Sequence, residues 1–228
     1  MLRISALALV LLLQALPLSG HAWAQPVYRS DAEPPMKMEP ALQQIEDRWA
    51  MIRYELKGKR EKLVAGKALI EDAATLVKDY PNRAEPLVWQ ALALLADAET
   101  RNDYTGLGLA KDAKRMLEQA ETIDPNAMAG LIPSTLGMLY YETPGWPLAF
   151  GDDKKAEALL KRALEINPGG QETNYYYGDY LVMNGKGREA VPYLERARLV
   201  AVCEGHERAD RGRKRDIQEA LDKALKDR

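Results

Sequence analysis

The sequence predicts an all-α fold in which a helical hairpin repeats along the chain. Alanine, leucine, lysine and glutamate dominate the 228 residues, whereas a single phenylalanine accompanies 11 tyrosines and 4 tryptophans. This composition favours helices over β-sheets. An apolar pattern with helical spacing recurs in three segments, and a second helical pattern precedes each copy. Because 32 basic residues nearly balance 34 acidic ones, a disordered tail and a nucleic-acid-coating protein are excluded.

The first segment has the features of a secretory signal. An apolar run from Ile4 to Leu16 follows Arg3, and the small-x-small triplet Ala22-Trp23-Ala24 precedes Gln25. This run is shorter than the roughly 20 residues that a membrane-spanning helix needs. We therefore expect residues 1–24 to be a cleaved signal peptide and the mature protein to be periplasmic or secreted, without stable membrane insertion. The alternative is an uncleaved N-terminal anchor.

The next segment, residues 25–39, is rich in proline and poor in apolar residues, so we expect a flexible leader. The helical repeat domain is expected to span residues 40–228. Its first unit, 40–81, is degenerate, with one helix near 40–56 and a second near 61–79. The apolar positions that predict these two helices are Leu42, Ile45, Trp49 and Ile52, then Ala73 and Leu76 before Pro81.

Three later units share one pattern in their second helix, with offsets of four, three and five residues. The first two offsets place an alanine, a leucine and a second alanine on one face, where the small residues allow a partner helix to approach closely. A proline then ends the helix in two of the three copies. The copies are Ala113, Leu117, Ala120 and Pro125; Ala156, Leu160, Ala163 and Pro168; and Ala190, Leu194, Ala197 and Val202.

The partner helix of each unit carries a small residue among large ones: Ala93, Gly137 and Gly178. These patterns predict units at 86–125, 127–168 and 171–203. The first two units hold additional residues between their helices, which we interpret as long loops. A final helix at 206–226 presents one apolar stripe, as the end of a solenoid requires, which gives nine helices and no strand. The stripe consists of Ile217, Ala220, Leu221, Ala224 and Leu225.

These residues resemble the tetratricopeptide repeat (TPR) family, whose units of about 34 residues show the same large, small, alanine and proline positions. Ala156 and Ala190 are 34 residues apart. The resemblance covers about Pro86 to Cys203 and implies an α-solenoid of stacked hairpins. The segment from Thr143 to Ala156 is also similar to an exported bacterial subgroup, the helical T component associated with TRAP-type solute transporters.

The TPR resemblance implies that the first helix of each unit lines a concave surface that binds a protein or peptide. The positions so placed mix apolar and polar side chains, and ordinary exposed helix surface is the alternative interpretation. They are Gln90, Leu94 and Asp97; Ser134, Met138 and Tyr141; and Tyr175, Asp179 and Val182.

The loop that contains Trp146 and Phe150 is the other candidate contact surface. These two aromatic residues lie among prolines and glycines in the additional residues of the second unit. They either pack back over the helices or remain open to a partner. We favour packing, since an exposed pair would promote aggregation.

No catalytic, metal or cofactor site is predicted. Beyond the signal segment the only histidine is His206, which we expect to be a neutral surface residue, and the only cysteine is Cys203, which we expect to be buried. The remaining polar motifs have structural interpretations: a helix cap at Asp152-Asp153, a loop at 105–108 and a solvated basic face at 208–215.

We therefore predict a non-enzymatic exported scaffold that binds a protein or peptide partner in the cell envelope. The alternative is a small-molecule carrier or transporter accessory, and a carboxylate hydrolase ranks third. Nucleic acid is not an expected partner, and the sequence does not determine the oligomeric state.

Overall fold

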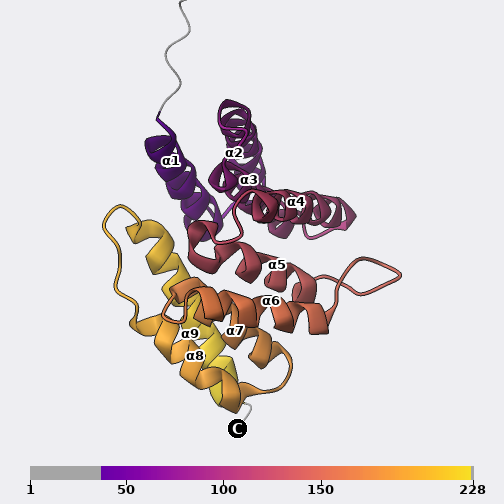
Figure 1. Ribbon diagram of the computed structural model, residues 1–228, viewed down its shortest axis with the longest axis vertical. Coiled ribbons are helices and arrows are strands. Elements are labelled where there is room, and N and C mark those ends of the chain that lie inside the picture. Colours follow the sequence, from indigo (N-terminus) through magenta and orange to yellow (C-terminus); the bar gives the residue numbers. More distant parts are fainter. Residues whose placement is uncertain (1–36, 227–228) are drawn as a thin grey trace, which may run out of the picture. The chain divides into compact units, whose positions relative to one another are not determined.

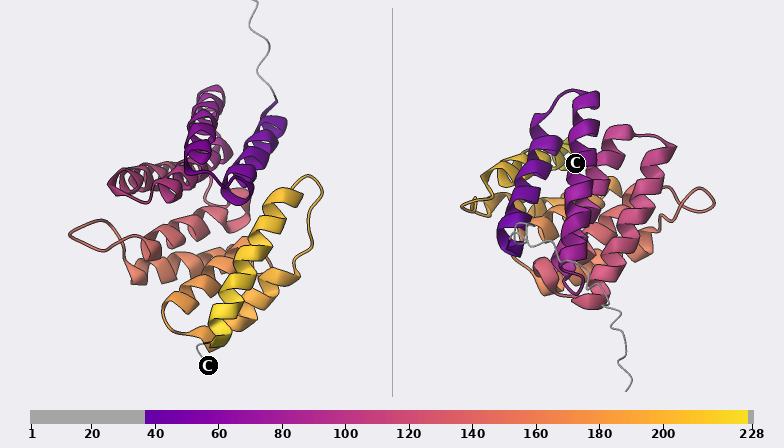
Figure 2. Two further views of the ribbon diagram at one scale, coloured as in Figure 1. Left: turned by 180° about the vertical axis from the view of Figure 1, so that it is seen from behind. Right: turned by 90° about the horizontal axis from the view of Figure 1, so that it is seen from above.

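The computed structural model describes residues 37–226, so the expected signal peptide and most of the expected leader lie outside the described residues. Nine α-helices and no strand occur in this part of the chain, as predicted (Figures 1 and 2). The helices are α1 (Met38–Ala50), α2 (Lys59–Asp79), α3 (Ala84–Arg101), α4 (Tyr104–Ile123), α5 (Leu131–Glu142), α6 (Asp153–Ile166), α7 (Gln171–Met183), α8 (Gly187–Leu199) and α9 (Glu207–Lys226).

Two short elements accompany them. A π-helical turn, η1 (Met51–Glu55), continues α1, and a 3-10 turn, η2 (Ala127–Gly130), leads into α5. Within residues 37–226, no helix is both long enough and apolar enough to cross a bilayer.

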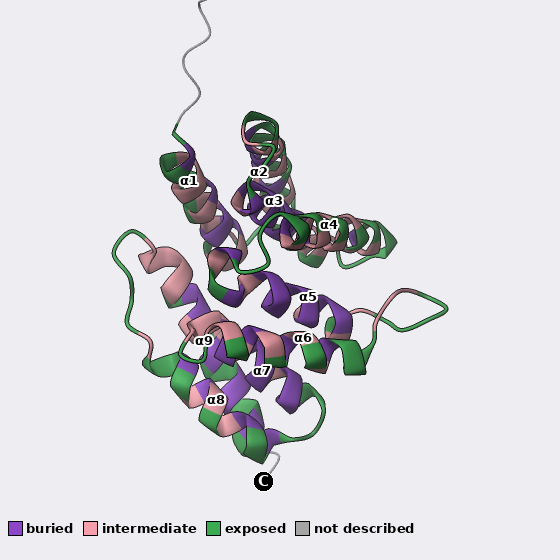
Figure 3. Cartoon of the chain, in the orientation of Figure 1, coloured by how far each residue is buried: buried purple, intermediate pink, exposed green. Residues whose placement is uncertain are grey.

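The three repeated hairpins pair α3 with α4, α5 with α6, and α7 with α8. The alanine and leucine positions of the second helices are all fully buried, and these side chains form the contact seams. A Cβ atom added to Gly137 would lie 2.6 Å from Cγ of Leu160, and one added to Gly178 would lie 2.6 Å from Cγ of Leu194. The seams predicted from spacing are therefore present. Figure 3 shows buried residues facing the neighbouring helices, with exposed ones on the outside.

The first hairpin has no long loop, which corrects the sequence interpretation. The additional residues lengthen α3 and α4, and only Asn102 and Asp103 separate the two helices. Asn102 adopts a left-handed conformation with φ of 51°, and the Asp103 side chain caps α4 by accepting a hydrogen bond from Gly106 N at 3.0 Å. The segment 105–108 is therefore the first turn of α4, and a Cβ on Gly106 would lie 2.7 Å from the Ala98 carbonyl oxygen.

The second hairpin does contain a loop, residues 143–152, which projects from the helices in Figure 1. Asp152 ends this loop and accepts a hydrogen bond from Lys155 N at 3.1 Å. The predicted capping role of Asp152 is confirmed.

The last helix, α9, does more than cap one end. It packs on α8 and α7, and its first half also reaches α1 and η1 (Figure 2). Ile217, Ala220, Leu221 and Ala224 of the predicted stripe are buried, but Leu225 is 43% exposed and does not belong to it. Helices from the two ends of the described region thus lie side by side.

Candidate ligand cavity on the inner face

A buried arginine joins α9 to the inner face of the repeats, the side lined by the first helices of the units, α3, α5 and α7. Arg213 is 4% exposed. Its guanidinium donates to Glu172 at 3.0 Å, to Asp216 at 2.9 Å and to the Tyr176 hydroxyl at 3.1 Å. Burial disfavours the charged form, but Glu172 and the surrounding tyrosines outweigh it and raise the pKa of Arg213. Arg213 also lies 4.5 Å from the ring centroid of Tyr175.

This arrangement corrects part of the expectation of a solvated basic face at 208–215, in which Arg211 and Arg215 are exposed as expected. Besides the buried Arg213, Arg208 forms ion pairs with Asp47 at 2.7 Å and with Glu55 at 3.0 Å. Charges in this segment therefore attach α9 to the first helix and η1.

Of two further expectations about this region, the surface position of His206 did not include its partner, and the burial of Cys203 was wrong. His206 Nδ1 lies 2.6 Å from a carboxylate oxygen of Glu46, and this hydrogen bond raises the pKa of His206. His206 is therefore a paired residue. Cys203 is exposed, since it lies in the segment between α8 and α9, where no helix covers it.

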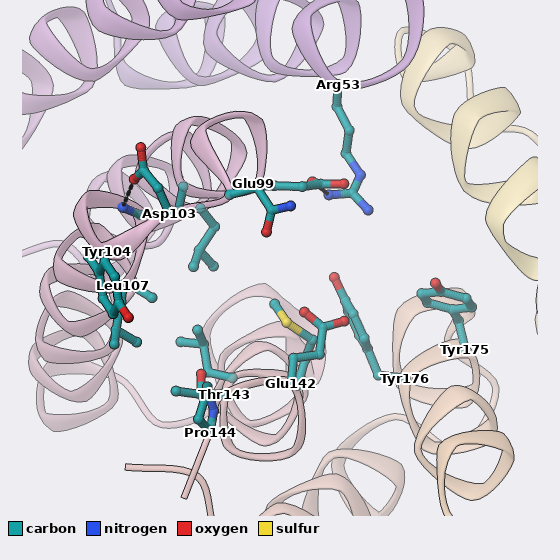
Figure 4. Close-up of a pocket in the computed structure, with 17 residues that line it drawn as sticks. Arg53, Glu99, Asp103, Tyr104, Leu107, Glu142, Thr143, Pro144, Tyr175 and Tyr176 are labelled. Carbon is teal, nitrogen blue, oxygen red and sulfur yellow. Dashed lines mark hydrogen bonds and ion pairs between the residues drawn. The ribbon is translucent and has the colours of Figure 1, made fainter. Parts of the chain in front are cut away.

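A cavity with a volume of about 820 Å³ opens where the repeats meet η1 (Figure 4). The ends of α3 and α5, the start of α4 and the first half of α7 surround it. Its apolar walls suit a ligand with hydrocarbon groups, and its size is that of a site for a small ligand or a few side chains. The apolar lining includes Leu95, Leu107, Ala110, Met138, Leu139 and Pro144.

Charged and hydroxyl groups lie among these apolar residues. Arg53 forms a 2.5 Å ion pair with Glu99, and the rings of Tyr175 and Tyr176 close the side formed by α7. Figure 4 shows the Glu142 carboxylate pointing into the space that Glu99 and Tyr176 border. The cavity thus combines apolar walls with carboxylates.

Glu142 differs from the other acids of the cavity. Glu142 is exposed to solvent, yet the surrounding protein atoms partly desolvate its carboxyl group. This desolvation, together with the nearby charge of Asp179, raises the pKa of Glu142 to about 7. Near neutral pH the cavity therefore holds a carboxyl group that is only partly ionised.

A second cavity, of about 510 Å³, lies beside α1, α9 and the start of α7. Trp49, Trp89, Leu92 and Met128 line it, and Tyr176 lines both cavities. The polar contacts among Tyr54, Asp216 and Arg213 occupy the inner face between α9 and η1. The inner surface is consequently divided into separate cavities.

The predicted contact residues fall into two groups. Met138 and Tyr175 line the larger cavity, and Tyr141 donates a 2.7 Å hydrogen bond to Asp179 on the same inner side. The others are buried by the neighbouring helices: Gln90, Leu94, Asp97, Ser134 and Val182 are all 8% exposed or less. A partner therefore cannot reach these five side chains without opening the fold.

Asp97 shows why helical spacing misplaced these five. It faces α2, where a Cβ on Gly66 would lie 3.4 Å from Oδ1 of Asp97, and its other oxygen pairs with Arg101 at 2.6 Å. The first helices of the units contact their neighbours over a wider face than the spacing rule assumed.

Sequence reasoning missed the acids and the arginine of the cavity. Glu99 lies in the last turn of α3 and Glu142 is the last residue of α5, so both occupy the end of the first helix of a unit. That shared position was a usable signal. Arg53 could not be found in this way, because it belongs to η1, which lies outside the three clear units.

The inserted loop separates its two aromatic side chains. Phe150 is half-buried and packs edge-on against Tyr140, with ring centroids 5.6 Å apart. Trp146 is 89% exposed and Leu148 is 70% exposed. Packing is therefore confirmed for Phe150 and wrong for Trp146.

We compared the chain with known proteins. No family model and no curated protein matches it. Among solved structures it is similar to a thermophilic TPR protein from Thermus thermophilus, with a TM-score of 0.52 and 18% identity over 82% of this chain and 98% of that one. The described helices have a TPR-like fold. At this identity the likeness extends to the fold alone.

Proposed function

We propose that this protein is an exported, non-enzymatic TPR-like scaffold that holds a short segment of an envelope protein. The cavity between α3, α4, α5 and α7 carries the proposal, because it lies on the inner side of the repeats and combines apolar walls with carboxylates. TPR-like folds typically serve as protein-interaction scaffolds, which supports the same interpretation.

The division of the inner surface limits what the partner presents. With α9 packed against α1 and η1, the inner side of residues 37–226 offers a long peptide separate cavities rather than one continuous groove. A few side chains inserted into the cavity match its volume of about 820 Å³. We therefore propose recognition of a short segment.

The proposal is tested by capturing partners from an envelope extract with wild type and two matched double variants. Leu107→Ala with Met138→Ala removes apolar atoms from the cavity walls. Met183→Ala with Leu199→Ala removes the same kinds of atom from exposed positions outside it. We expect a specific partner to be lost only with the first pair. Equal recovery with both would contradict cavity binding.

Trp146 offers a second contact. An 89% exposed tryptophan beside a 70% exposed leucine is an apolar surface of the kind that partners bind. We propose that the 143–152 loop contacts the same partner outside the cavity. In the capture experiment Trp146→Ala should reduce the amount of partner recovered without abolishing it. Recovery of the partner at the wild-type level would contradict a contact with the loop.

Export follows from the proposed signal peptide. N-terminal sequencing of protein expressed in a bacterial host with its full signal should give Gln25 as the first residue of material recovered from the periplasm or the medium. Protein that retains Met1 and stays in the cytoplasm would contradict export.

A small-molecule carrier is the second candidate, favoured by the second cavity and its two tryptophans. Such a carrier would serve a solute transporter, as the resemblance to the TRAP-associated T component implies. Native mass spectrometry of purified protein distinguishes the two functions. A carrier should retain a small ligand that denaturation releases, whereas a scaffold should show the mass of the polypeptide alone.

A further inference from the structure

We infer that the larger cavity selects a partner segment whose inserted side chain is a lysine or an arginine flanked by apolar residues, with Glu142 as the counter-charge. This inference rests on the proposed function and names the chemistry of the segment. It follows from how the charges around the cavity are already paired.

The cations near the cavity have partners. Arg53 is held by Glu99 at 2.5 Å and lies 3.6 Å from Asp216. Arg213 is held by Glu172 and by the same Asp216. Arg53 Nε has no hydrogen-bond partner within residues 37–226, but an anionic ligand would have to compete with these carboxylates for the charge of either arginine.

Two acidic side chains of the inner face, Glu142 and Asp179, lack ion pairs of this kind. Glu142 makes no hydrogen bond or ion pair with the described residues, and Asp179 receives a hydrogen bond only from the neutral Tyr141. Arg53 and Arg213 act on Glu142 only from a distance, because each forms its ion pairs with other carboxylates, so Glu142 has no direct cationic partner among the described residues. A carboxylate confined by apolar walls gains most from a cation that arrives with the ligand.

The walls suit the stem of such a side chain. Lysine and arginine bury three or four methylene groups while their charged end stays near polar groups. Leu107, Met138 and Pro144 provide apolar surface in the cavity that Glu142 also lines. An inserted lysine can therefore lie along these residues and place its ammonium at the carboxylate.

Three capped pentapeptides test the inference. They differ only in the central residue, which is lysine, methionine or glutamate, between flanking leucines. Binding is followed through the methyl signal of Met138, which lines the cavity and is assigned by its loss in Met138→Leu. Since the chain has 8 methionines, the others report whether a shift is confined to this site.

We expect the lysine peptide to bind at least about ten times more tightly than the glutamate peptide, with the methionine peptide between them. Glu142→Gln should abolish this preference, while Glu118→Gln, which alters a carboxylate of α4 outside the cavity, should retain it. Butylammonium, a lysine side chain without its peptide, should bind far more weakly than the lysine peptide.

Three results would overturn the inference. The first is binding of all three peptides without preference, or with glutamate preferred. The second is an unchanged preference in Glu142→Gln. The third is butylammonium binding as tightly as the lysine peptide, which would identify a free amine as the ligand. Absence of any shift at Met138 with every peptide would instead contradict the proposed peptide site itself.

Discussion

The seams between paired helices and the inner face around α9 are built from different chemistry. Each seam repeats the same alanine, leucine and glycine contacts, with Leu117, Leu160 and Leu194 all fully buried. The inner face is held by charges and tyrosines that do not repeat, with Arg213 at its centre. The seams therefore produce a solenoid, and the inner contacts convert its open curve into cavities.

The largest effect is expected from Arg213→Ala. Removing this guanidinium leaves Glu172 and Asp216 without their buried partner, which should cost about 3–5 kcal/mol. Arg208→Ala is the matched control on the same helix. Its pairs are partly exposed, so the loss should stay below about 1 kcal/mol. Urea unfolding of both variants measures the two costs, and equal costs would show that the inner face is not a buried network.

Gly137→Leu probes a seam. The new side chain would start 2.6 Å from Cγ of Leu160, and the overpacking should cost about 1–3 kcal/mol. Gly108→Leu is the control, because nothing lies within 4 Å of a Cβ at that helical position. The control should be neutral or stabilising, as leucine favours helix over glycine. Unchanged melting of Gly137→Leu would contradict the assigned seam.

The difference between the two regions also explains what the sequence could predict. The seams depend on residues a few positions apart on one helix, such as Ala156, Leu160 and Ala163, so spacing alone revealed them. The inner face depends on residues far apart in the chain. The Tyr54 hydroxyl, for example, donates a hydrogen bond to Asp216, which is 162 residues away in the sequence. No local pattern encodes that pairing.

The loop predicted at 105–108 was wrong for a related reason. Gly106 and Gly108 suggested a loop, because glycine disfavours helix in general. At Gly106 the missing side chain instead allows α4 to approach the Ala98 carbonyl of α3. The candidate site was predictable only in part, as Met138 and Tyr175, because burial by neighbouring helices is a property of packing rather than of helical spacing.

The inserted loop combines a packed and an exposed aromatic residue. Phe150→Ala should cost about 1–2 kcal/mol, because the half-buried ring packs on Tyr140. Trp146→Ala should change the free energy of unfolding by less than about 0.5 kcal/mol, since this side chain is 89% exposed. Thermal unfolding compares the two. A large cost at Trp146 would mean that the loop packs on the helices.

Glu142→Gln should have a small effect whose size depends on pH. The pKa of this carboxyl is raised from 4.5 to about 7, so ionising it opposes folding, and stability should fall as pH rises from 4.5 through 7. After allowance for its accessibility, the glutamine variant should be more stable than wild type by about 1 kcal/mol at pH 8 and equal to it at pH 4. Urea unfolding at both pH values checks this, and a variant less stable at pH 8 would contradict the shift.

The central claim is that α9 folds back onto α1 and closes the inner face. The exposed Cys203 and a second cysteine at Gln43→Cys place spin labels on the two sides of this contact, where Gln43 donates a 2.5 Å hydrogen bond to the Gly205 carbonyl. Pulsed electron resonance should give a single short, narrow distance distribution in the protein without added ligand. A long or broad distribution would show an open solenoid with a continuous groove.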